Sequence, residues 1–427
     1  MTLFLMFIGM VALVLIDVPI AVALAVVTVV AMLATQGLDI LPNLPIVMFS
    51  GATKFPLLAI PLFILAGAIM NSTSITRRII AFASAVLGFI RGGLAMVNIG
   101  ASMFFAEISG SAVADVAAIG SVMIPAMKKK GYPLPFAAAI TSSAATLAVI
   151  IPPSIPMILY AVMADTSVVQ LFVAGIIPGV LGGLGMMTLA YWFARRYHWP
   201  IEEAFQLRRV WAMFKDAFWA LTLPFIILGG IFGGWVTATE GAGLAVLAAL
   251  VIGLVIYHDL DVRQLKDAVI EGGVQTAIVM LLVASSALIG VFLTEEKVPQ
   301  EIAAGITRLT DNKYVVLAIL NLFFFVIGLF LHSAAAIILV VPIVMPLVTQ
   351  IGIDPVHFGM VVTLNLGIGQ QTPPVASVLM TACSIAKADI WEVTKVNVWF
   401  IGVLLAVLIL VTYVPIVALL PVEFFYR

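Results

Sequence analysis

Apolar segments long enough to cross a bilayer follow one another along the whole chain. They restrict the chain to a small number of possible folds. Residues 168–193, 218–236 and 274–293 are examples. A membrane-spanning helix needs about 20 apolar residues. The composition agrees, because 63% of the 427 residues are hydrophobic and 10% are charged, against about 25% charged in soluble domains. We therefore predict an all-α, multi-pass membrane protein whose main solvent is lipid.

The sequence also excludes several function classes. The net charge of −1 provides no field that would attract nucleic acid. Cys383 is the only cysteine and the four histidines are widely spaced, so neither a disulfide nor a clustered metal site is expected. No phosphate-binding Gly-rich loop is present, so ATP does not drive this chain. The first basic residue is Lys54, which argues against a cleavable signal peptide.

Prolines break several of the apolar segments. Pro19 follows Asp17 within the first segment, which predicts two short helices meeting at Asp17 or one kinked helix. Pairs of prolines, Pro152-Pro153 and Pro373-Pro374, interrupt two later segments. Irregular backbone at membrane depth is tolerated only where it is buried in protein or lines a cavity. These breaks therefore mark candidate functional sites.

The landmarks recur at one spacing, which indicates an internal repeat. Pro125 and Pro346, Gly131 and Gly352, and the two proline pairs are each separated by 221 residues. Chance alignment of common prolines is the alternative. We predict a first repeat over residues 1–198, a cytoplasmic amphipathic connecting arm over 199–217, and a second repeat over 218–427.

Basic residues set the expected orientation, since Lys and Arg favour cytoplasmic loops. Arg91 and the lysines at 128–130 flank residues 92–127, so this segment is expected to enter and leave on the same side as a re-entrant hairpin. A broken helix over 133–163 follows. The second repeat should contain a hairpin over 315–347 and a broken helix over 357–386, in opposite orientation. Inverted repeats with broken helices are typical of secondary transporters.

Polar residues gather at the expected hairpin tips and at the breaks. Glu107, Ser109, Gly110, Ser111 and Asp115 lie in the first hairpin. Intramembrane carboxylates are costly, and free carbonyls and hydroxyls suit a hard cation such as sodium. A small-residue packing face is the alternative interpretation.

The other polar positions also have two interpretations each. Ser154 follows the first proline pair, and Gln370 and Gln371 precede the second. The alternative for both breaks is a proline kink whose backbone is satisfied by local Ser and Thr hydroxyls. His332 and Ser333 form the second expected tip, where a lone histidine is more often a buried polar residue than a ligand.

A set of short motifs resembles the large membrane subunit of tripartite ATP-independent periplasmic (TRAP) transporters. The resemblance covers essentially the whole chain, although each motif alone is weak. The sequence departs from the family pattern at Gln370 and Gln371, where apolar residues are expected, and at Ala376, where glycine is usual. The motifs are Ser109-Gly-Ser-Ala-Val-Ala-Asp-Val-Ala-Ala-Ile-Gly120, Gly131-Tyr-Pro133, Ile151-Pro-Pro-Ser154, Thr237-Ala-Thr-Glu240 and Thr372-Pro-Pro374.

The resemblance implies function, partners and movement. It implies import of an organic acid, of the C4-dicarboxylate or sialic acid class, across a bacterial inner membrane. The partners would be a small membrane (Q) subunit and a periplasmic substrate-binding (P) protein, and the coupling ion would be sodium, with no organic cofactor. Residues 92–163 and 315–386 would move together past a scaffold of the remaining spans, in an elevator-type mechanism.

The expected site residues follow from this hypothesis. Nine positions are expected to contribute sodium ligands: Ser109, Gly110, Ser111, Pro152, Ser333, Asn365, Gly367, Thr372 and Pro373. Five are expected to contact the substrate: Ser142, Ser143, Ser154, His332 and Gln371. The main alternative is a self-sufficient sodium/dicarboxylate symporter that needs no binding protein. A membrane enzyme is disfavoured because no nucleophile or metal set accompanies Glu107 and Asp115.

Overall fold

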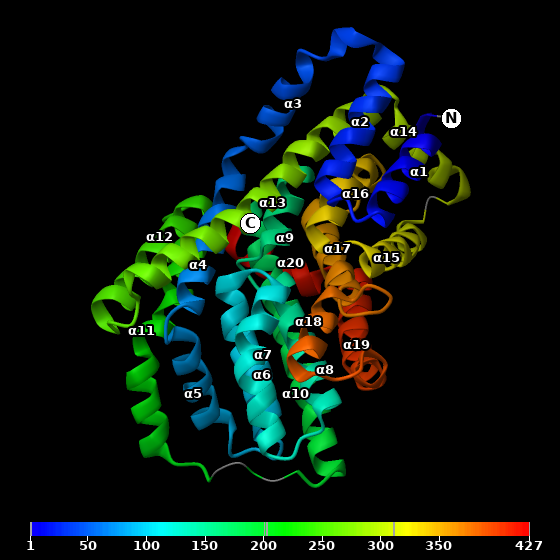
Figure 1. The fold of residues 1–427 in the computed structure, drawn as a ribbon. Helices are drawn as coiled ribbons and strands as arrows, with labels where there is room; N and C mark the ends of the chain where they lie inside the picture. The colour runs from blue at the N-terminus through cyan, green and yellow to red at the C-terminus, as the bar shows by residue number, and fades with distance from the viewer. Residues whose placement is uncertain (1, 200, 202–203, 311, 427) are drawn as a thin grey trace.

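The computed structural model describes residues 2–199, 201, 204–310 and 312–426, without the side chains of residues 2–4, 7, 11, 14, 15 and 107–109. The described residues form helices joined by short turns (Figure 1). The first half contains α1 (Thr2–Leu15), α2 (Ile20–Gln36), α3 (Asn43–Ala52), α4 (Ala59–Asn71), α5 (Ile75–Leu87), α6 (Gly93–Ser109), α7 (Ala112–Lys129), α8 (Leu134–Ala145), α9 (Ile155–Met163) and α10 (Val168–Arg196). The second half contains α11 (Leu207–Phe232), α12 (Ala238–Val251), α13 (Val262–Glu295), α14 (Val298–Leu309), α15 (Lys313–Phe330), α16 (Ser333–Gln350), α17 (Pro355–Gly369), α18 (Ser377–Ala386), α19 (Ile390–Tyr413) and α20 (Ile416–Tyr426).

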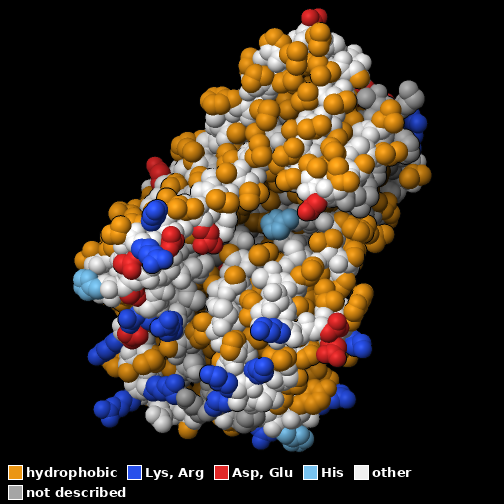
Figure 2. All heavy atoms as spheres, in the orientation of Figure 1, with side chains coloured by type: hydrophobic (Ala, Val, Ile, Leu, Met, Phe, Trp, Pro, Cys, Tyr) orange, Lys and Arg blue, Asp and Glu red, His pale blue; other side chains and the backbone are white. Residues whose placement is uncertain are grey.

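Seven helices in the described part of the chain are long and apolar enough to cross a bilayer, or eight if the bent α3–α4 pair is one span. Hydrophobic side chains cover the upper part of the face in Figure 2, while most Lys and Arg side chains gather over the lower part. This distribution supports the expected multi-pass arrangement, and the preference of Lys and Arg for cytoplasmic loops predicts that the basic end faces the cytoplasm.

The first apolar segment consists of two short helices. α1 ends at Leu15 and α2 begins at Ile20, directly after Pro19. Asp17 between them has a φ of +66°, which continues neither helix. The expected break at Asp17 is therefore confirmed as two helices rather than one kinked helix.

Three helix boundaries differ from the sequence expectation. α3 was not anticipated; it forms a bent pair with the next helix at 63°. α11 begins at Leu207, so the second part of the expected arm over 199–217 is the start of a long helix. The polar composition of residues 259–271 predicts a connector before the apolar segment at 274–293, but α13 includes most of these residues and extends over 34 residues, about 50 Å. Charged residues at the ends of a tilted helix can lie outside a hydrocarbon core of about 30 Å. The polar residues at the start of α13 can therefore remain helical although the hydropathy of the sequence falls there.

Two helical hairpins and two broken helices form the centre of the molecule. Residues 110–111 join α6 to α7, and residues 331–332 join α15 to α16. α6 and α7 pack along each other, whereas α15 packs mainly on α17 and α16 packs mainly on α9 and α14. The breaks lie between α8 and α9 and between α17 and α18. Both Pro-Pro bonds are cis.

The helix boundaries follow the spacing found in the sequence. α7 begins at Ala112 and α16 at Ser333, which are 221 residues apart, and both helices have 18 residues. α8 begins at Leu134 and α17 at Pro355, at the same spacing. The two matching glycines, Gly131 and Gly352, both have positive φ values, of +81° and +73°.

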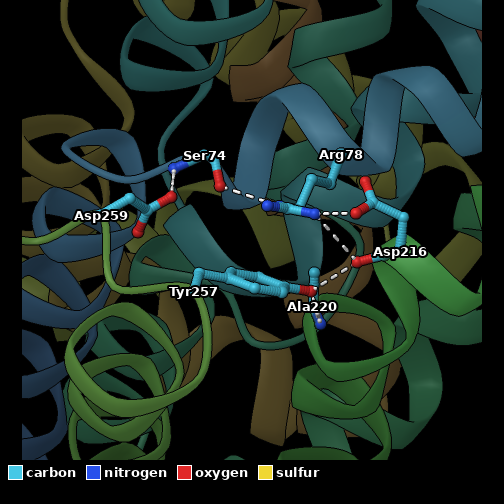
Figure 3. A network of polar contacts seen from close by, with 6 residues as sticks. All are labelled: Ser74, Arg78, Asp216, Ala220, Tyr257 and Asp259. Carbon is cyan, nitrogen blue, oxygen red and sulfur yellow. Dashed lines mark hydrogen bonds and ion pairs between the residues drawn. The ribbon is translucent and has the colours of Figure 1, made fainter.

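A polar network ties α5 to α11 and to the turn before α13 (Figure 3). Arg78 pairs with Asp216 and lies with its guanidinium carbon 4.0 Å from the centre of the Tyr257 ring. The Tyr257 hydroxyl donates to the Asp216 carbonyl at 3.0 Å, and the Ser74 amide donates to Asp259 at 2.8 Å. Partial burial raises the pKa of Tyr257. The network fixes the turn between α4 and α5.

Candidate functional site

Both hairpin tips and both breaks border one cavity of about 180 Å³ at the centre of the molecule. Its polar lining comes from segments far apart in the sequence, and its apolar wall comes partly from α4 and α13. The polar residues are Ser111, Gln275, His332, Ser333 and Gln370, with Gly110 beside them. The structure therefore brings together the tips that the sequence singled out.

The first tip rests directly on the first break. Gly110 ends α6 with a φ of +58°, in the left-handed region that glycine adopts readily. A Cβ at this position would lie 3.1 Å from the Ile155 amide nitrogen and 3.2 Å from the Pro153 carbonyl oxygen. The Ile155 amide also donates to the Gly110 carbonyl at 3.4 Å. Ser111 is the N-cap residue of α7 and borders the cavity.

The second tip has the equivalent relation to the second break. The Val375 amide donates to the Leu329 carbonyl at 3.3 Å, and Gly328 packs against Gly369 where α15 crosses α17. His332 caps α16, since its Nδ1 accepts from the Ala334 amide at 3.4 Å. His332 and the buried Ser333 both face the cavity.

Gln371 and Ser143, expected as substrate contacts, lie on the side of the second break that faces α19. Both are wholly buried together with Asn397 of α19. The Ser143 Oγ lies 2.7 Å from both the Gln371 Oε1 and the Asn397 Oδ1. The Asn397 amide donates to the Gln371 carbonyl at 3.0 Å. These contacts tie α8 and the second break to α19, away from the cavity lining.

Hydroxyls at the breaks make local bonds. Ser154 donates to the Val149 carbonyl at 2.8 Å, and Thr372 donates to the Ile368 carbonyl at 2.8 Å. Such bonds are expected from the alternative interpretation of the breaks, a proline kink at which nearby Ser and Thr hydroxyls bond to the backbone carbonyls that the kink leaves unpaired. Ser142 is buried and its Oγ has no hydrogen-bond partner among the described residues.

The remaining expected ligands lie in or beside the breaks. Asn365 donates to the Asn321 Oδ1 at 2.5 Å and to the Val361 carbonyl at 2.9 Å, which joins α17 to α15. Gly367 packs against Thr146. Pro152 is buried in the first break, and Pro373 is partly exposed in the second. The side chains of Ser109 and Glu107 lie outside the described part of the structure, and Asp115 is buried in α7.

Two cavity residues were missed from the sequence as site residues. Gln370 was noted at the second break and as a departure from the family pattern, but it was not placed among the expected ligands or substrate contacts, and Gln275 lies within an apolar span. A signal for Gln275 did exist, because Glu271 precedes it by one helical turn and accepts from its side chain at 3.4 Å. No group of His, Cys, Asp or Glu that could hold a metal occurs among the described residues. A cation at this cavity would therefore depend on hydroxyl, amide and carbonyl oxygens.

The helical hairpins, the two broken helices and the central cavity are typical of a membrane transport protein. The family model described as the tripartite ATP-independent periplasmic transporter, DctM component, matches residues 7–417. The chain therefore belongs to the DctM family, the large permease subunit of TRAP transporters. This confirms the resemblance inferred from the motifs.

Relatives agree with this assignment, and two solved structures have a similar fold. The isethionate TRAP transporter permease protein DctMQ of Oleidesulfovibrio alaskensis is 40% identical over 94% of this chain, which spans 63% of that relative's length. The C4-dicarboxylate large permease DctM of Pseudomonas aeruginosa is 38% identical over 89% of both chains. The YdaH transporter of Alcanivorax borkumensis has a similar fold, with a TM-score of 0.61 at 16% identity over 90% of this chain and 89% of that one. The Neisseria gonorrhoeae efflux pump MtrF is similar, with a TM-score of 0.63 at 15% identity over 90% and 86%.

Proposed function

We propose that this chain is the translocating subunit of a sodium-coupled TRAP system that imports an organic anion delivered by a periplasmic binding protein. The observation that carries the proposal is the single cavity bordered by both hairpin tips and both breaks. Relatives are named for isethionate, C4-dicarboxylates and sialic acid. These substrates share an acidic group, so we widen the expected substrate class to carboxylates and sulfonates. A small membrane subunit and a bacterial inner-membrane location complete the proposal.

We propose sodium as the coupling ion, with ligands from the tip residues Ser111 and Ser333 and neighbouring carbonyls. Hydroxyl and carbonyl oxygens suit a hard cation. A cation and an anion bound together are nearly neutral, so the loaded site crosses a low-dielectric region at lower cost than a half-loaded one. This difference would suppress leakage of the ion gradient.

We propose an elevator movement of two inverted repeats, with a moving body larger than the sequence suggested. The buried contacts among Ser143, Gln371 and Asn397 would have to break if α19 stayed behind with the scaffold. Each buried polar group left unpaired costs about 1–3 kcal/mol. Phe136 of α8 also packs on Phe193 of α10 and Phe400 of α19, with ring centres 5.6 Å and 5.9 Å away. We therefore place α10 and α19 with the hairpins and breaks.

Reconstituted uptake tests the proposal. The chain with its small subunit and candidate binding proteins is placed in proteoliposomes and supplied with a sodium or a proton gradient. We expect uptake only with sodium and only with a binding protein. Ser111→Ala should lower the apparent sodium affinity, while Thr188→Ala, exposed on α10 and bonded only within its own helix, should not. Uptake on a proton gradient alone would reject sodium coupling, and uptake without any binding protein would favour the self-sufficient symporter.

A further inference from the structure

Three neighbouring cavities form one passage that leads away from the hairpin tips. The second, of about 430 Å³, shares Ile64, Ser111, Gln275 and His332 with the central cavity. The third, of about 400 Å³, shares Asn71, Ala117 and Glu271 with the second. Cavities that share several lining side chains lie next to each other. The passage therefore connects the candidate transport site with the start of α5.

One face of each of three helices forms the wall of the passage. α7 contributes one face, with lining residues at 111, 113–114, 117–118 and 121–122, a rise of about 16 Å. Small side chains such as Gly67, Ala114 and Ala117 leave the space open. α13 contributes Gln275 and then Glu271, so the wall becomes more polar away from the tips. α7 belongs to the proposed moving body and α4 and α13 to the scaffold, so the passage follows the seam between them.

Two opposite charges border the outer end of the passage. Arg77 and Glu271 both line the third cavity, and both are exposed. Among the described residues, Arg77 makes no ion pair, whereas the neighbouring Arg78 is held by Asp216 (Figure 3). That contact anchors the first turn of α5 and leaves Arg77 facing the cavity. α5 runs toward the lower, Lys- and Arg-rich end of the molecule, the expected cytoplasmic side (Figures 1 and 2).

We propose that Arg77 and Glu271 form a charged mouth on the cytoplasmic side, where Arg77 receives the carboxylate or sulfonate of the leaving organic anion and Glu271 receives the leaving sodium ions. The inference rests on the proposed function. A single charge within about 8 Å of a partly solvated passage changes the local concentration of a monovalent ion roughly three- to tenfold. One passage with both charges serves two solutes of opposite sign. If Arg77 served only to set the orientation of the chain in the membrane, removing its charge would change the access of anions and cations to the passage equally.

Thiol chemistry inside the passage tests the proposal without knowledge of the substrate. Ala114 lines the second cavity and is partly exposed, so Ala114→Cys places a reporter thiol midway along it. The single native cysteine, Cys383, is buried and is replaced by alanine. The full chain with its small subunit, in sealed vesicles, is treated with membrane-impermeant methanethiosulfonates that carry a sulfonate or a trimethylammonium group.

We expect the reporter thiol to react with reagent supplied from the cytoplasmic side. Arg77→Gln should lower the labelling rate of the anionic reagent about three- to fivefold and raise that of the cationic reagent. Glu271→Gln should have the opposite effect on the two rates. Arg77→Lys keeps the positive charge and should change neither rate. Arg263→Gln is the matched control, because Arg263 is exposed on α13 but borders none of the three cavities.

Three results would overturn the proposal: an unreactive reporter thiol, equal effects of Arg77→Gln on both reagents, or an effect of Arg263→Gln as large as that of Arg77→Gln. Uptake by the unmodified complex is measured separately. Loss of sodium-driven uptake with charge-dependent labelling intact rejects the proposed function and not the passage. If uptake is normal but labelling does not depend on these charges, the proposed charged mouth at Arg77 and Glu271 is rejected and the proposed transport function is not.

Discussion

Replacing Gly369 by alanine tests how closely α15 and α17 pack in the structure. A Cβ at Gly369 would lie 2.5–2.7 Å from the carbonyl carbon, the Cα and the carbonyl oxygen of Gly328. Favourable contact between carbon atoms begins at about 3.5 Å. All three neighbours are backbone atoms, so no side-chain rotation can make room. α15 would have to move away by about 1 Å, and overpacking of this kind costs about 1–3 kcal/mol.

Cys383 provides the assay, because this single cysteine is 8% exposed in the folded chain. A maleimide dye that fluoresces on thiol addition then reports thermal unfolding in detergent. At about 2 °C per kcal/mol, Gly369→Ala should lower the melting temperature by roughly 2–6 °C. Gly402→Ala is the matched control, since nothing lies within 4 Å of a Cβ there, and alanine in an open helix should stabilise by about 0.5–1 kcal/mol. Equal melting of wild type and Gly369→Ala would refute the close approach of the two helices.

Three further predictions use the same melting assay. Ala376 precedes α18 with a φ of +46°, a conformation that costs a non-glycine residue about 1–2 kcal/mol, so Ala376→Gly should raise the melting temperature. Asn397→Leu should lower it, since the buried Gln371 carbonyl loses its donor at a cost of about 1–3 kcal/mol; an unchanged melt would argue against the tie to α19. Arg78→Lys should destabilise by about 1 kcal/mol through loss of the stacking on Tyr257, whereas Arg77→Lys should not, and equal effects would contradict the network.

The sequence predicted features that local chemistry determines. The break before Pro19 and the tips at Gly110 and His332 lie where expected. The Thr-x-x-Glu spacing of Thr237 and Glu240 is that of a capping box, and Thr237 does cap α12, with the Glu240 carboxylate accepting from the Thr237 amide at 2.8 Å. Each of these features depends on residues within a few positions of one another, so periodicity and capping rules suffice to find it.

Features that depend on tertiary packing could not be read in this way. The boundaries of α11 and α13 were missed because hydropathy falls where the charges begin, while the backbone hydrogen bonds of the helix continue. Gln370 and Gln371 are adjacent, yet one borders the cavity and the other contacts α19. Helical periodicity assigns faces only within regular helices, and the backbone from 370 to 376 is irregular. The pair of polar residues Glu271 and Gln275 is visible in the sequence, but its place at the cavity required knowing which span packs against the hairpin tips.

The division between Gln370 and Gln371 locates the boundary across which movement would occur. On the Gln371 side, buried hydrogen bonds to Asn397 and Ser143 join the break to α19 and α8. On the Gln370 side, the break faces a cavity whose opposite wall includes Gln275 of α13. Water or a bound solute can hydrogen-bond to polar groups that separate across a cavity, whereas nothing replaces a buried hydrogen bond in an apolar interior. For the proposed elevator movement, the low-cost surface for sliding would therefore lie between the second break and α13, with α19 on the moving side.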